Sequence, residues 1–158
     1  MRVDVMSRLR GVGLFASLWR RRTTISLPDG FSINVLSLPD LVRAKKTQRD
    51  KDWPMVRRLM EAHYFQHRDT PTPARIRFWA LELRSPELLI EVARRNRTAC
   101  ERAARQRPLL RHAARGDQMA LEAALHEEEA LERDADRRYW RPLRAELERI
   151  RRQRVRRR

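Results

Sequence analysis

Prolines divide the second half of this chain into short segments, and their spacing restricts the fold more than any other feature of the sequence. A proline cannot continue a helix normally, so it marks helix starts and the turns between helices. Between these breaks apolar residues recur at helical spacing, as Ile76, Trp79, Ala80 and Leu83 do. We therefore expect residues 68–158 to be all helical. The breaks are at Pro71, Pro73, Pro86, Pro108 and Gly116.

A longer helix is expected from about Gln118 onward, with Pro142 kinking or splitting it. Acidic and basic residues four apart would support this helix on its exposed face. A seam of apolar residues follows near its end and could pack on the body of the protein or on a partner helix. The seam consists of Trp140, Leu143, Leu147 and Ile150.

The first half of the chain predicts strands as well as helices. Residues 23–27 and 31–36 read as two strands joined by the turn Pro28-Asp29-Gly30, and Asp4 lies in a further short strand between two valines. The sequence thus predicts an α+β chain. A small partial mixed sheet with helices would occupy residues 1–67, ahead of the all-helical region.

Two helices are expected to follow the strands. Ser37 and Asp40 resemble a capping box, with Pro39 in the first turn, so a helix should run from about residue 38 to residue 47. Asp52 can cap the next helix, which has Pro54 in its first turn.

The charge of the chain favours anionic partners. Its 158 residues carry a formal net charge of +16, and such a field attracts nucleic acid, nucleotides or acidic lipid. The apolar runs are too short to span a bilayer, so we expect a soluble protein with no membrane partner. The single cysteine, Cys100, excludes an internal disulfide and fits a reducing cytoplasm.

All three lysines of the chain fall between Lys45 and Lys51, while every other basic residue is an arginine. An ammonium is a compact charge that can seat on a phosphate. Continuing the apolar stripe of the expected helix at steps of three and four leads to Lys45 and then Arg49. A snorkelling lysine near a helix end is the alternative. With Asp52 close by, we expect two cations and a carboxylate to converge where two helices meet the sheet, a group suited to an anionic phosphate.

The run from Ile33 to Asp52 resembles a segment of the minimal and abortive-infection (toxin) type nucleotidyltransferases, in the DNA polymerase beta superfamily. Those proteins have a strand, a helix carrying a lysine, and an R-x-K-D or R-x-x-D element. The resemblance, over roughly residues 2–67, implies that Lys45 and Asp52 are catalytic and that Lys45 and Arg49 bind nucleotide. It also implies that Asp4 is the third carboxylate and a metal ligand, with Mg²⁺ as the cofactor of an active enzyme.

Such enzymes carry a Gly-Ser or Gly-Gly turn and a D-x-D strand before the third carboxylate. Here three residues precede Asp4, so we expect the chain as written to lack two-metal catalysis. It would be a fragment, a remnant or a non-catalytic derivative. A partner protein that supplies or covers the missing part of the sheet is then a further expectation.

The basic end of the chain gives a rival interpretation. Arginines there could bind RNA or DNA phosphates without reading sequence, or could be a solvated terminus. In this alternative the protein is a basic helical module that binds nucleic acid or a protein. The residues concerned are Arg149, Arg151, Arg152, Arg154, Arg156, Arg157 and Arg158.

Other candidate sites are weaker on geometry. His63 and His67 are four apart but lack the glutamate of a metalloprotease motif, so a core-edge role is favoured. Asp134 and Asp136 would lie mid-helix and point about 200° apart, so they do not form a metal dyad.

Overall fold

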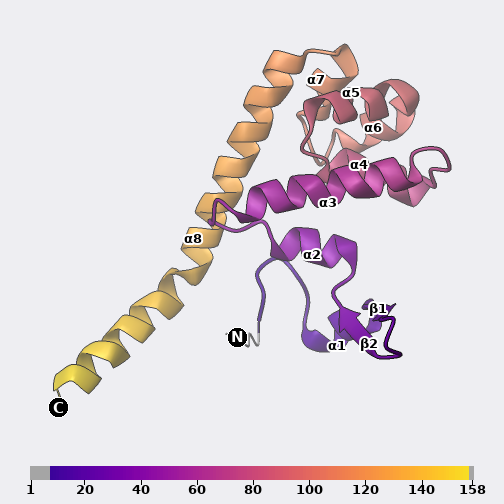
Figure 1. The fold of residues 1–158 in the computed structure, drawn as a ribbon. Coiled ribbons are helices and arrows are strands. Elements are labelled where there is room, and N and C mark those ends of the chain that lie inside the picture. The colour runs from indigo at the N-terminus through magenta and orange to yellow at the C-terminus, as the bar shows by residue number, and fades with distance from the viewer. Residues whose placement is uncertain (1–7, 157–158) are drawn as a thin grey trace.

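The computed structural model describes the backbone of residues 8–156 and the side chains of residues 8–153. It shows an α+β chain with a two-stranded sheet and a long C-terminal helix, as expected (Figure 1). The sheet is antiparallel within this part of the chain, and not mixed. The strand predicted around Asp4 lies outside the described residues. The elements are α1 (Phe15–Arg20), β1 (Thr23–Ser26), β2 (Ser32–Val35), α2 (Leu38–Ala44), α3 (Asp52–His67), α4 (Pro73–Glu82), α5 (Pro86–Arg95), α6 (Arg97–Ala103), α7 (Leu110–Arg115) and α8 (Gln118–Arg156).

The starts of α2 and α4 and the end of α7 follow the sequence signals, whereas the N-cap of α3 is Lys51 and not the expected Asp52. The Ser37 side chain accepts the Asp40 amide at the start of α2, and Thr72 caps α4 in the same way. Gly116 ends α7 with a φ of 72°, a conformation that glycine adopts readily. Pro142 lies inside α8 and does not split it.

One hydrophobic core joins α2 and α3 to the helical region. Its largest fully buried side chains include Trp79, Tyr64 and Met60, which interlock helices α3 and α4. Figure 1 shows α4 to α7 gathered beside α3 and the first half of α8. Thus α2 and α3 pack with the predicted all-helical region, while α1 and the hairpin contribute no buried residue to this core.

The second half of α8 extends away from this core (Figure 1). On the predicted apolar seam, Leu143 is 49% exposed and Leu147 is 45% exposed. Of the two roles predicted for the seam, packing on the body is therefore not observed at these two residues.

Candidate functional site

The candidate site is built on the loop of residues 45–51, which joins α2 to α3 and which we call the lysine loop. Helix α2 ends at Ala44, three residues earlier than the predicted end at Thr47. The reason is that the backbone finds other partners: the Thr47 amide donates to the Lys45 carbonyl oxygen at 2.9 Å, and the Gln48 amide donates to Asp136 at 3.0 Å. The lysines therefore lie at and beyond the helix end.

The expected convergence of Lys45, Arg49 and Asp52 is present. Lys45 Nζ lies 3.4 Å from Asp52 Oδ1, and Arg49 Nε donates to Asp52 Oδ2 at 2.9 Å. Thr47 Oγ1 adds a third donor to Asp52 Oδ2 at 2.5 Å. The carboxylate at the start of α3 thus contacts the side chains of three of the seven residues of the lysine loop.

Asp52 is enclosed while its cations reach solvent. Its side chain is 1% exposed, against 28% for Lys45 and 54% for Arg49. Burial raises the pKa of Asp52, but the hydrogen bonds from Thr47 and Arg49 and the charge of Lys45 outweigh it and hold this pKa below its usual value. Asp52 is therefore ionised at neutral pH, and both of its oxygens are engaged.

Helix α8, and not the hairpin, completes the site. Asp136 on α8 accepts the Gln48 amide, and Arg10 Nε donates to the same carboxylate at 3.1 Å. Arg10 also donates to the Lys46 carbonyl oxygen at 2.6 Å. The hairpin instead lies beside the start of α2 (Figure 1), so the expectation that the sheet borders this site is wrong for the described strands.

Sequence reasoning did not find Arg10, Thr47 and Asp136 as parts of this site. The contacts of Asp136 join residues 88 and 126 positions apart, and no local pattern signals them. The geometry does confirm that Asp134 and Asp136 diverge: Asp136 is buried, whereas Asp134 pairs with Arg137 at the surface.

The three lysines have different surroundings. Lys46 Nζ lies 2.7 Å from Glu82 Oε2, and the Lys46 side chain is 15% exposed. Lys46 thus helps to fix the lysine loop to α4. Lys51 stands exposed at the N-cap of α3, where its side chain makes no capping hydrogen bond.

Two other candidate residues are Asp4 and His63. Asp4 lies outside the described residues, and within the described part of the chain no group of three His, Cys, Asp or Glu side chains could hold a metal ion. His63 accepts a hydrogen bond from Trp79 Nε1 at 2.9 Å through Nδ1, as suits a core-edge histidine.

The described part of the basic end belongs to the last turns of α8, away from the lysine loop (Figure 1). Arg149 donates to Glu146 at 2.9 Å, and Arg151 and Arg152 are exposed. Arg154 and Arg156 belong to the backbone of α8, but their side chains are outside the described set, as are residues 157–158.

A pocket of about 320 Å³ lies between the end of the lysine loop, α3 and α8. Its lining mixes arginines with carboxylates, including Arg57, Arg133, Asp50 and Glu129. Arg133 already pairs with Asp50 and Glu129. The balance of charges makes this pocket a poor phosphate site, and it does not include the two cations held by Asp52.

None of the described helices is long and apolar enough to cross a membrane. Comparisons with protein-family models, curated proteins and solved structures gave no significant match to this chain.

Proposed function

We propose that this is a nucleotidyltransferase-like protein that binds the phosphates of a nucleotide through Lys45 and Arg49, with Asp52 as the positioning residue. The observation that carries the proposal is the shared, buried carboxylate of Asp52, which lies within 3.4 Å of Lys45 and 2.9 Å of Arg49. Two cations oriented before the ligand arrives lose less conformational freedom on binding than two mobile side chains would.

The geometry of the two cations suits this role. Asp52 engages Arg49 through Nε, so the two terminal nitrogens of the guanidinium are outside this ion pair. Lys45 makes a long contact of 3.4 Å with Asp52, and its ammonium has two further protons to donate. Phosphate oxygens accept from both kinds of donor.

The described residues do not fit Mg²⁺. Asp52 has both oxygens engaged by Thr47, Arg49 and Lys45, and no metal-ligating group of three is found in the described part of the chain. A metal role for Asp4 stays a prediction. The proposal accordingly covers nucleotide binding and includes no catalytic step through a metal.

Binding of ATP, GTP, CTP and UTP, each measured by isothermal titration calorimetry without divalent cations, tests the proposal. We expect Lys45→Ala and Arg49→Ala each to weaken binding about 10- to 100-fold, the loss of a charge-assisted contact. Lys51→Ala is the matched control, since it removes the same charge from an exposed position of the same loop. Equal weakening by all three variants would contradict the proposal, as would the absence of nucleotide binding by the wild-type protein.

A second candidate function is binding of nucleic acid phosphates by the projecting half of α8. The favouring observation is the exposure of its arginines beyond the core, on a helix that stands clear of the body (Figure 1). A variant with Arg149, Arg151 and Arg152 changed to alanine should lose affinity for duplex DNA uniformly across sequences and show a shallower salt dependence. It should leave nucleotide binding unchanged if Lys45 and Arg49 form the nucleotide site.

A further inference from the structure

The hairpin of β1 and β2 has one apolar face and one polar face. In its register Ile25 lies opposite Ile33 and Thr23 lies opposite Val35, so these side chains share a face. All eight strand residues are exposed, including Ile25 at 43% and Ile33 at 44%. An isolated two-stranded hairpin is marginally stable in water, so an uncovered apolar face indicates that something packs there.

The hydrogen-bond pattern fixes which backbone groups point outward. The Leu27 amide donates to the Phe31 carbonyl oxygen at 2.7 Å, which makes these residues a hydrogen-bonded pair. Such pairs alternate along an antiparallel ladder, so Ile25 and Ile33 form the next one. The backbone N–H and C=O of Ser26 and Ser32 consequently point away from the partner strand, toward the two outer edges of the hairpin.

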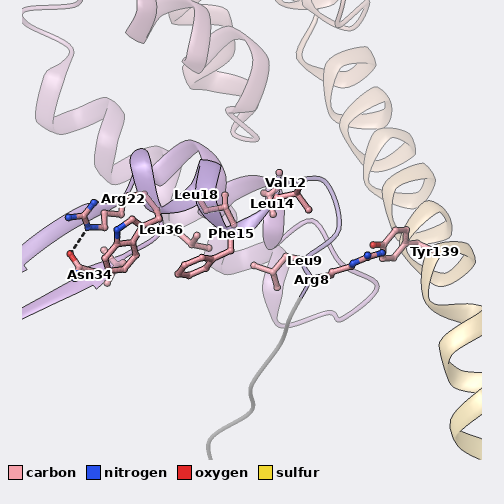
Figure 2. Close-up of a pocket in the computed structure, with 13 residues that line it drawn as sticks. Arg8, Leu9, Val12, Leu14, Phe15, Leu18, Arg22, Asn34, Leu36 and Tyr139 are labelled. Carbon is pink, nitrogen blue, oxygen red and sulfur yellow. Dashed lines mark hydrogen bonds between the residues drawn. The ribbon is translucent and has the colours of Figure 1, made fainter.

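An apolar pocket of about 580 Å³ lies beside the end of β2. Leu9, Phe15 and Leu18 line it from the N-terminal segment and α1, and Tyr139 of α8 bounds its far side (Figure 2). Its lining includes residues 34–36 at the end of β2 and, on the other side of the hairpin, Arg22, which directly precedes β1. The pocket therefore borders the end of β2, where Asn34 lines it, and the backbone groups of Asn34 point outward on the same edge as those of Ser32.

We propose that a strand of an acidic partner polypeptide pairs with the outer edge of β2 and places apolar side chains in this pocket. When a strand adds to an exposed sheet edge, main-chain hydrogen bonds provide the affinity, and pockets that receive every second side chain of the added strand provide the specificity. Phe15 and Trp19, which stack with ring centroids 5.7 Å apart, form an aromatic wall for such side chains. Phe15 is 71% exposed in the absence of the partner.

Charge selects the kind of partner. Arg8 and Arg22 lie on the rim of the pocket, in a chain of net charge +16, so acidic side chains complement this face. A second copy of this chain is disfavoured as the partner, because a two-fold symmetric contact would bring the same positively charged arginines of the two copies close together. A lipid surface would cover apolar side chains but offers no backbone to pair with Ser32.

The test compares two proline variants that form a matched pair. Ser32→Pro removes an outward N–H from the β2 edge, and Ser26→Pro removes its counterpart from the β1 edge, since these serines lie opposite each other. The probe is a labelled synthetic decapeptide that alternates valine and glutamate, read by fluorescence anisotropy. We expect Ser32→Pro to weaken binding about tenfold and Ser26→Pro to have little effect. Phe15→Glu should also weaken it, because it places a carboxylate in the apolar pocket.

Circular dichroism of both proline variants checks that the helical body is intact, which a change in the exposed hairpin should leave unaltered. The proposal is overturned if the peptide does not bind, if both proline variants lose the same amount of peptide affinity, or if a valine–lysine peptide binds as tightly as the valine–glutamate peptide. Self-association that Ser32→Pro abolishes would identify a second copy as the occupant. Equal binding of both proline variants to phosphatidylserine vesicles, with no peptide binding, would identify a lipid surface.

Discussion

Neutralising Asp52 tests the central interaction of the site without removing a side chain. Asp52→Asn keeps the shape of the residue but replaces an acceptor oxygen with a donor NH₂ that faces cations. In the wild-type protein the Asp52 carboxylate accepts hydrogen bonds from Thr47 at 2.5 Å and from Arg49 at 2.9 Å, and it lies 3.4 Å from Lys45. A hydrogen bond to a charged group contributes about 1.5–3 kcal/mol. We expect the free energy of unfolding to fall by about 2 kcal/mol.

The exposure of the partners limits this magnitude. A buried ion pair broken on one side costs about 3–5 kcal/mol when the other charge is stranded. Here Lys45 is 28% exposed and Arg49 is 54% exposed, so water can solvate both cations once Asp52 is neutral. The estimate therefore stays below that range.

Urea unfolding at several pH values provides the assay. The pKa of Asp52 is lower in the folded protein, so its contribution is fully present above the unfolded pKa of about 3.9 and is lost as the pH falls toward the folded value. The difference between wild type and Asp52→Asn should therefore shrink below about pH 4. Asp50→Asn is the control, because the Asp50 side chain is 94% exposed. Equal destabilisation by both variants, or a gap that does not change with pH, would refute the reasoning.

Two further variants probe ionisable groups at the edge of the core. Burial is the main cause that lowers the pKa of His63 in the folded protein, and nearby positive charge adds to it, so the wild-type free energy of unfolding should rise as the pH increases toward about 6.5. Urea titrations of His63→Phe should show a smaller rise. An unchanged rise in this variant would contradict the role given to His63. Glu128→Gln leaves Arg84 and Arg107, 8% and 4% exposed, without the carboxylate that both contact, and should cost about 3–5 kcal/mol in chemical denaturation. Glu127→Gln, on the exposed face of α8, should change stability little, and a similar loss there would count against a special role for the ion pairs of Glu128 with the two buried arginines.

The parts of the structure that could be predicted depend on short sequence separations. The cap formed by Ser37 and Asp40 spans three residues, and the convergence of Lys45 on Asp52 spans seven. Helical and loop geometry alone places such groups close together, so residue spacing was enough to predict them. The same holds for the start of α8 at Gln118.

The rest of the site depends on packing that no local pattern encodes. Arg10 reaches Asp136 across 126 positions, and Lys46 reaches Glu82 from the lysine loop. In an arginine-rich helix any carboxylate can find a neighbouring cation, as Asp134 finds Arg137. Residue spacing therefore does not distinguish an acid that folds inward, such as Asp136, from one that stays at the surface.

Buried carboxylates support the proposal that two cations among so many bind a defined ligand. The chain has 37 basic and 21 acidic residues, so positive charge alone does not distinguish one site from another. Asp52 and Asp136 differ from most of the acids because they are nearly inaccessible, and both hold the lysine loop. The arginines near the end of α8 are exposed, and Arg149 pairs with the exposed Glu146. Long-range attraction would come from the whole surface, whereas a fixed phosphate position requires cations that are already held, which favours Lys45 and Arg49 over the basic end.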